Sequence, residues 1–122
     1  MTSPRAQQHI AFLTAADALK GVTRANVLMD GSRHENTAEH SWHIALWALV
    51  MADTPPAGCD LDRALRIALV HDLVEVYAGD HPIHLPQDAD LIATKETAAA
   101  DRIFGLLPAP QGAELRALWT DF

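Results

Sequence analysis

Cysteine, lysine and long apolar runs are scarce in this chain, and each scarcity excludes a class of protein. A single cysteine, Cys59, can form neither an internal disulfide nor a cysteine-based zinc cluster, so we expect a reducing, cytoplasmic setting. The longest apolar run, Ile44 to Ala52, is far shorter than a membrane span, and no signal-peptide pattern opens the chain. Only two of the nine basic residues are lysines, and the net charge of -7 argues against binding a nucleic-acid polymer.

The composition and the periodicity favour one all-α domain over residues 1–122. The length of 122 residues suffices for one compact domain and not comfortably for two, and the 49% of apolar residues suffices for a core. The alternating pattern of strands is missing almost everywhere. We therefore expect a bundle of about five helices, with the second and third as its buried centre. Their expected ranges are 5–19, 36–52, 60–79, 89–106 and 110–122, with a long connection at 20–36 that contains the turn signal Asp30-Gly31-Ser32.

Titratable groups interrupt the two most apolar of these helices. His71, Asp72 and Glu75 follow the run ALV, and His40 lies in TAEHSWHIALWALVMA. Such groups are costly to bury unless they are paired or hold a metal. In a continuous helix His71 and Glu75 lie one turn apart on the same face, with Asp72 rotated by about 100°. Imidazole and carboxylate together suit Mn, Fe, Co, Ni or Zn better than Ca or Mg, although Mg stays possible.

A purely structural role for these residues is the alternative interpretation. A His-Asp pair in a helix is usually structural or exposed, His40 taken alone fits a core histidine, and Glu75 taken alone fits an ion pair with an arginine. The joint pattern on two central helices is what favours a metal site between them.

The same residues resemble a known family. The order His40, then His71-Asp72, is similar to the HD-domain superfamily of metal-dependent phosphohydrolases. Its 5'-nucleotidase-like (5'-deoxynucleotidase) branch is the closer match. That match rests on Arg24, on Arg33 followed by E-N-x-x-E-H ending at His40, and on H-D-x-x-E-x-x-x-G-D from His71 to Asp80. The specific motifs cover roughly residues 19–82.

The resemblance implies an HD-domain helical bundle that removes phosphate from nucleoside 5'-monophosphates, often deoxyribonucleotides. It makes His40, His71 and Asp72 the ligands of a divalent metal. Glu75 then positions the attacking water, and Asp80 contacts the sugar or assists the leaving oxygen.

The resemblance also assigns Arg24 and Arg33 to phosphate binding or to shaping the pocket. Arginine suits that task because its planar guanidinium binds phosphate through paired hydrogen bonds. The alternative for Arg33 is a solvated loop arginine or a clamp on Glu39.

One feature of the family has no counterpart here. Its members carry a further metal-ligating aspartate on a later helix, and neither Asp101 nor Asp121 fits that position. We therefore expect a domain truncated at its C-terminal side, with three protein ligands, weaker metal binding and doubtful activity of this chain alone. The apolar surface so uncovered predicts a homo-oligomer. The alternatives are another phosphohydrolase substrate or a non-catalytic metal-binding or interaction module.

Overall fold

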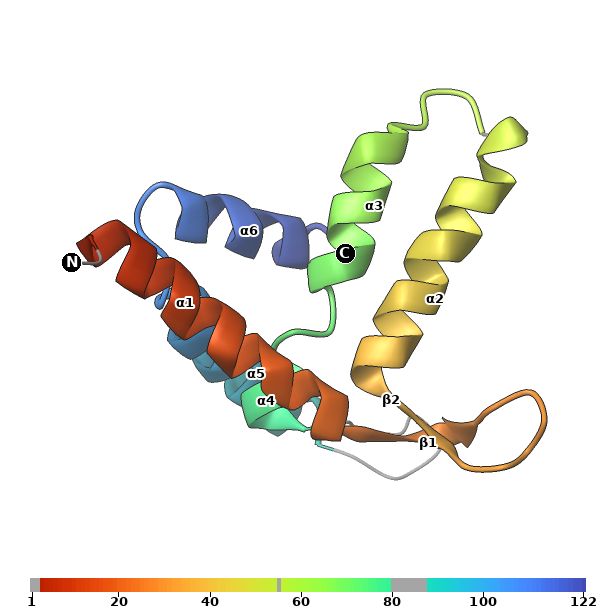
Figure 1. Ribbon diagram of the computed structural model, residues 1–122, viewed down its shortest axis with the longest axis horizontal. Helices are drawn as coiled ribbons and strands as arrows, with labels where there is room; N and C mark the ends of the chain where they lie inside the picture. The colour runs from red at the N-terminus through yellow and green to blue at the C-terminus, as the bar shows by residue number, and fades with distance from the viewer. Residues whose placement is uncertain (1–2, 55, 80–87) are drawn as a thin grey trace.

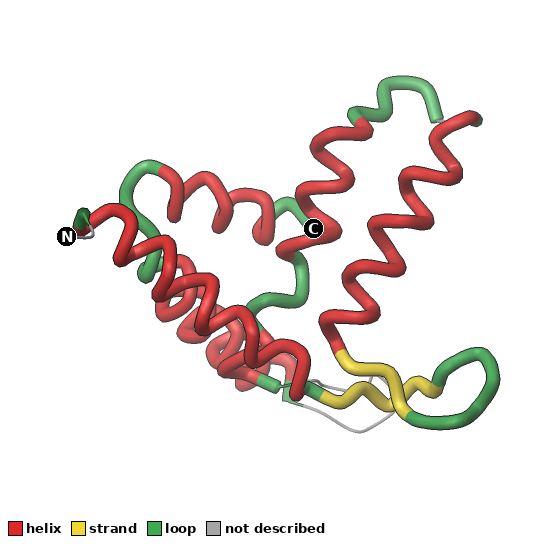
Figure 2. The backbone as a smooth tube through the Cα atoms, in the orientation of Figure 1, coloured by secondary structure: helices red, strands yellow, loops and turns green. Residues whose placement is uncertain are grey.

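The computed structural model describes residues 3–54, 56–79 and 88–122. Helices dominate the described residues, so the predicted all-α class is confirmed, and the hairpin β1–β2 is the addition that the sequence did not predict (Figure 2). The elements are α1 Pro4–Asp17, β1 Thr23–Val27, β2 His34–Asn36, α2 Thr37–Val50, α3 Leu61–Val70, α4 Glu75–Ala78, α5 Ala89–Phe104 and α6 Gln111–Thr120, with 3₁₀ helices at Ala18–Gly21 and Met51–Asp53.

The helices form two groups that meet at α3 (Figure 1). Helices α1, α4 and α5 lie side by side, and α6 connects this group to α3, on which it packs. Helices α2 and α3 form an antiparallel pair at the other end, with the hairpin at the foot of α2. The chain end lies beside α3, near the point where the two groups meet.

The hydrophobic core lies between α1, α5, α6 and the end of α3, with α4 packed against it. The prediction of helices two and three as the buried centre is therefore wrong for α2, whereas α3 contributes Val70 to the core. In α2 only Thr37 and Ser41 are buried, while Trp42 and Trp47 are 63% and 53% exposed. An apolar sequence indicates that a helix can pack against other helices, but it does not indicate which helices become its neighbours. The core residues are Phe12, Leu19, Val70, Leu73, Val74, Ala99, Ala100, Ile103, Phe104, Leu107 and Leu118.

The start of α2 is fixed by a reciprocal cap, as the sequence predicted. The Asn36 side chain accepts a hydrogen bond from the Glu39 amide at 2.9 Å, and the Glu39 carboxylate accepts one from the Asn36 amide at 2.9 Å. Two orphan amide donors of the first turn are thereby satisfied. This cap holds His40, in the first turn of α2, at a defined place relative to β2.

The expected helix 60–79 is broken at His71–Val74, which corrects the sequence prediction. The Leu73 amide bonds to the Val70 carbonyl at 3.1 Å, three residues back and not four. Helix α4 then runs from Glu75 to Ala78 and is followed by Gly79, whose φ of 77° only glycine adopts without strain. The break turns Leu73 and Val74 into the core, at 7% and 4% exposure, and leaves His71 and Asp72 in the bend.

The expected connection 20–36 contains an antiparallel hairpin. Thr23 pairs with Asn36 and Val27 with His34 across it. The Asp30-Gly31-Ser32 turn is present, with the Asp30 carboxylate accepting from the Ser32 amide at 2.9 Å. The strands are short and mostly exposed, so the alternation that identifies a strand is missing from their sequence.

None of the helices in the described ranges combines the length and the hydropathy that crossing a bilayer requires.

Candidate metal centre

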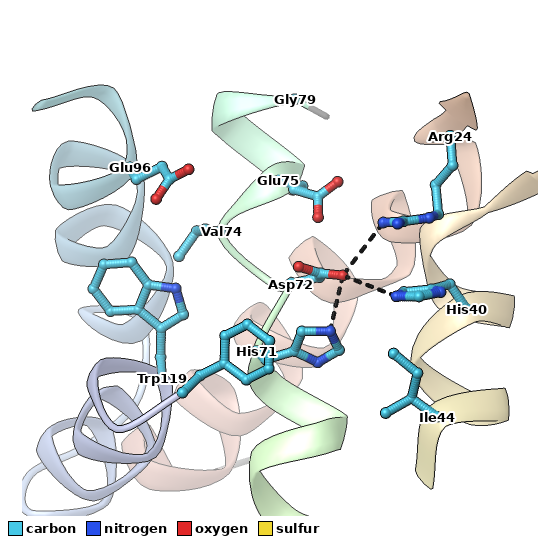
Figure 3. Close-up of a pocket in the computed structure, with 11 residues that line it drawn as sticks. Arg24, His40, Ile44, His71, Asp72, Val74, Glu75, Gly79, Glu96 and Trp119 are labelled. Atoms are coloured by element: carbon cyan, nitrogen blue, oxygen red, sulfur yellow. Dashed lines mark ion pairs between the residues drawn. The ribbon is translucent and has the colours of Figure 1, made fainter. Parts of the chain in front are cut away.

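Three side chains from two elements converge on one point. One ligand atom each from His40, His71 and Asp72 lies within 4.8 Å of the others. Asp72 Oδ2 is 3.0 Å from His71 Nε2 and 3.8 Å from His40 Nε2 (Figure 3). The first turn of α2 supplies His40, and the bend after α3 supplies the other two. The structure therefore brings the three predicted ligands together.

The spacing of these atoms fits a first-row divalent ion. Nitrogen and oxygen ligands lie about 2.0–2.2 Å from such an ion, so two ligands on one ion lie about 3–4 Å apart. The measured 3.0 and 3.8 Å fall within that range. The pocket around the trio leaves room for further ligands beside the three side chains.

Both imidazoles have a neighbour that orients the ring. Nδ1 of His71 donates a hydrogen bond to the Ala68 carbonyl at 2.7 Å, so in the neutral ring Nε2 carries the lone pair that can bind a metal. Nδ1 of His40 lies 3.2 Å from Glu35 Oε1, and this carboxylate favours the same tautomer. Metal-binding histidines typically show this arrangement, in which an outer carboxylate or carbonyl fixes the ring. Glu35 is the first residue of the E-N-x-x-E-H motif, but the sequence did not predict that it orients a histidine.

The charge around the trio favours an ionised Asp72. Burial raises the pKa of Asp72, but the hydrogen bond from His71 and the charges of His71 and Arg24 outweigh burial and lower this pKa below its usual value. An ionised carboxylate is the form that binds a cation.

The surroundings lower the pKa of His40 and raise the pKa of His71. Burial and the nearby Arg24 hold the pKa of His40 below its ordinary value, so this ring stays neutral. Burial also works against a charged His71, but its hydrogen bond to Asp72 and the charge of that carboxylate raise the pKa of His71. If His71 and Asp72 held a divalent cation, they would release the proton that they otherwise share.

The hairpin brings Arg24 to the site but keeps Arg33 away from it. Arg24 Nη1 is 3.5 Å from Asp72 Oδ2, and Arg24 Nε is 3.6 Å from Glu35. Arg33 instead pairs through two nitrogens with the Glu39 carboxylate, at 2.8 and 2.5 Å, and is half exposed. That pairing is the clamp on Glu39 that the sequence left open, and a contact of Arg33 with phosphate stays a prediction.

Glu75 lies in the same pocket, on the far side of the bend. It is 9% exposed, and its Oε1 accepts a hydrogen bond from the Thr37 hydroxyl at 3.3 Å. Thr37 is fully buried and its hydroxyl also faces the Val22 carbonyl at 3.2 Å, so α2 and the turn before β1 hold Glu75 in place. Asp80, the other residue predicted to be catalytic, lies outside the described residues.

The trio opens into a cavity of about 360 Å³. Three of its lining residues carry no motif and were missed by the sequence analysis: Glu96 of α5, Trp119 of α6 and Phe122 (Figure 3). The Phe122 ring lies 4.6 Å from the His71 ring, centre to centre. No sequence signal could have placed them there, because each comes from a helix or chain end far from the motifs.

The two later aspartates, Asp101 and Asp121, form ion pairs with arginines and are not part of the metal cluster. Asp101 forms an ion pair with Arg116, and Asp121 forms one with Arg63 of α3. Within residues 3–54, 56–79 and 88–122, His40, His71 and Asp72 are the one cluster with the geometry of a metal site.

Comparison with known proteins identifies the family. Residues 16–122 match the model of the HD domain. The chain belongs to the HD domain family. Human 5'-deoxynucleotidase HDDC2 is 31% identical over 120 residues, or 96% of this chain and 56% of the relative, and the bovine protein is 30% identical over the whole chain and 58% of the relative.

A solved structure has a fold similar to that of this HD domain. The crystal structure of a predicted metal-dependent phosphohydrolase from Magnetospirillum magnetotacticum MS-1 is similar with a TM-score of 0.89 and 42% identity. The similarity covers 98% of this chain and 60% of that chain. The chain thus spans little more than half the length of the relatives it matches.

Proposed function

We propose that this HD domain hydrolyses the phosphomonoester of nucleoside 5'-monophosphates, deoxyribonucleotides among them, with a divalent metal. The observation that carries the proposal is the convergence of His40, His71 and Asp72, each histidine turned by a neighbour so that Nε2 faces Asp72. The matched relatives named as 5'-deoxynucleotidases support the substrate class.

The donor set favours Mn, Fe, Co, Ni or Zn over Ca, and Mg fits less well. Two imidazole nitrogens and one carboxylate oxygen are intermediate ligands, whereas Ca and Mg prefer oxygen alone. When bound, such an ion polarises a phosphoryl oxygen as a Lewis acid.

Arg24 and Glu75 complete the proposed chemistry. Arg24 lies beside Asp72, where its guanidinium offsets the negative charge that develops on the equatorial oxygens of a transferred phosphoryl group. Glu75 is held by Thr37 at the pocket wall, where its carboxylate orients the attacking water and accepts a proton from it. Asp80 follows Gly79 directly, so we assign it the sugar or the leaving oxygen, and to Arg33 we assign support of the pocket through Glu39.

The test is phosphate release from deoxynucleoside 5'-monophosphates with added Mn²⁺ or Co²⁺, compared between the native chain and His71→Ala. We expect release by the native chain and a loss of at least about 100-fold in the variant, because a metal contributes several kcal/mol to the barrier. Asp101→Asn, whose carboxylate lies outside the pocket, is the matched control and should keep full activity. Equal release from native chain and His71→Ala would overturn the proposal, and metal binding without release would indicate a binding module instead.

We also propose that this chain forms a homo-oligomer through α2. From His40 to Ala52 the sequence has no charged residue, and Trp42, Trp47 and Val50 are more than half exposed. On a chain of net charge -7, this face lets two copies meet without repulsion between like charges. Light scattering should give a multiple of 13.3 kDa for the native chain and 13.3 kDa for Trp47→Glu. A native monomer at high concentration would refute this.

A further inference from the structure

Glu96 places a carboxylate in the cavity opposite the metal trio. It is the one acidic residue of α5 that lines this cavity, and it is half-buried. In Figure 3 its carboxylate extends from α5 into the space beside Glu75, while Asp72, His40 and Arg24 gather on the other side. The metal trio uses residues from α2 and from the bend, so Glu96 reaches the site from an independent helix.

Among the residues that the structure describes, Glu96 has no ion pair and no hydrogen bond. A carboxylate accepts hydrogen bonds and donates none when it is ionised. A ligand that displaces water from this carboxylate must supply an N–H or O–H donor in its place, because a buried acceptor left without a donor costs free energy. The described cations of the cavity do not meet this need, because Arg24 is engaged with Glu35 and Asp72.

The cavity therefore has two chemically different ends. At one end the metal ligands and Arg24 suit a phosphate. At the other end Glu96 repels a phosphate but accepts hydrogen bonds, and the apolar side chains of Val74 and Trp119 lie near it. The volume of about 360 Å³ lies within the range of small-molecule sites, about 300–1,000 Å³.

We propose that Glu96 accepts a hydrogen bond from the nucleoside part of the substrate, and so determines specificity for nucleotides over other phosphomonoesters. This inference rests on the proposed function, because it requires phosphate at the metal end of the cavity. The donor is an amino group of the base or a hydroxyl of the sugar, which share the chemistry that a carboxylate recognises.

The experiment compares Glu96→Ala and Glu96→Gln with the native chain on three substrates: dAMP, dTMP and p-nitrophenyl phosphate. The last has no N–H or O–H donor outside its phosphate. For Glu96→Ala we expect kcat/KM for dAMP to fall roughly tenfold to hundredfold, mainly through KM, as expected for a lost hydrogen bond to a charged group. Hydrolysis of p-nitrophenyl phosphate should stay within about twofold. Glu96→Gln keeps an acceptor oxygen and should lose less.

The two nucleotides distinguish the source of the donor. Adenine carries an exocyclic amino group, whereas the one base donor of thymine is its N3–H, so a contact with the amino group predicts a loss for dAMP alone. A sugar contact predicts the same loss for dAMP and dTMP. Glu114→Gln, an exposed carboxylate on α6 outside this cavity, is the matched control and should behave as the native chain does.

Binding provides a readout that does not need turnover. The affinity for a non-hydrolysable phosphonate analogue of dAMP, measured by calorimetry, should fall by the same factor in Glu96→Ala. If the native chain releases no phosphate but this affinity still depends on Glu96, the hydrolase proposal fails and this inference stands. Equal losses on p-nitrophenyl phosphate and nucleotides, or unchanged nucleotide affinity in a folded Glu96→Ala, would overturn it.

Discussion

Glu35 should raise the affinity of the His40, His71 and Asp72 site for a metal, although it is not one of the three predicted ligands. Its Oε1 lies 3.2 Å from His40 Nδ1 and 3.6 Å from Arg24 Nε, and its side chain is only 16% exposed. Replacement by alanine leaves the His40 ring free to rotate and to place its proton on either nitrogen. One of the three ligands then loses its fixed orientation, whereas His71 keeps the Ala68 carbonyl.

The magnitude follows from the geometry. Removing an outer partner of a metal ligand costs about 10–100-fold in affinity, or about 1.4–2.7 kcal/mol. The distance of 3.2 Å exceeds the 2.7–2.9 Å of a strong charge-assisted hydrogen bond, so we expect the lower half of that range, about 10–30-fold, for Glu35→Ala. Glu35→Gln keeps an oxygen acceptor for Nδ1 and should lose only about threefold.

The assay is titration of the metal-free chain with Co²⁺ or Zn²⁺ against a chelator of known affinity. Glu114→Ala serves as the control, because Glu114 is an exposed glutamate remote from the trio. Circular dichroism before titration shows that each variant is folded. Metal affinity of a folded Glu35→Ala within twofold of the native value would refute the orienting role of this carboxylate.

Three further predictions concern stability. Ile103 is fully buried, so Ile103→Ala should lower the free energy of unfolding by about 2–5 kcal/mol in urea titration, against at most about 0.5 for the exposed Leu91→Ala; similar losses would contradict the placement of the core. The hydrogen bond from Arg33 lowers the pKa of Glu39 from 4.5 to about 2, so this pair stabilises the fold above pH 4.5 and stops doing so as the pH falls through about 2. Glu39→Gln keeps the cap, so its deficit in melting temperature should be present at pH 6 and vanish toward pH 2; a deficit independent of pH would refute the pair. Mn²⁺ at 100 times its Kd should stabilise the chain by about 2.7 kcal/mol and should not stabilise His71→Ala, and an unchanged melting temperature of the native chain with Mn²⁺ or chelator would count against a folded-state metal site.

The sequence predicts the elements with strong local signals. Asn36 and Glu39 predicted the start of α2, and Gly79 predicted the end of the expected helix 60–79, where α4 ends in the structure. His40, His71 and Asp72 were identified because titratable groups in apolar segments need partners or a metal.

The features that the sequence did not predict depend mostly on tertiary packing. The bend at His71–Val74 contains neither proline nor glycine, and packing of Leu73 and Val74 into the core accompanies it. The exposed apolar face of α2 and the position of Glu96 depend on which helices become neighbours, which no local pattern encodes.

Diffraction from a crystal soaked in Mn²⁺ or Zn²⁺ tests the central claim most directly, because anomalous scattering locates the ion itself. The account predicts one strong peak about 2.0–2.3 Å from the Nε2 atoms of His40 and His71 and from a carboxylate oxygen of Asp72. A peak elsewhere, or no peak between these three side chains, would contradict it.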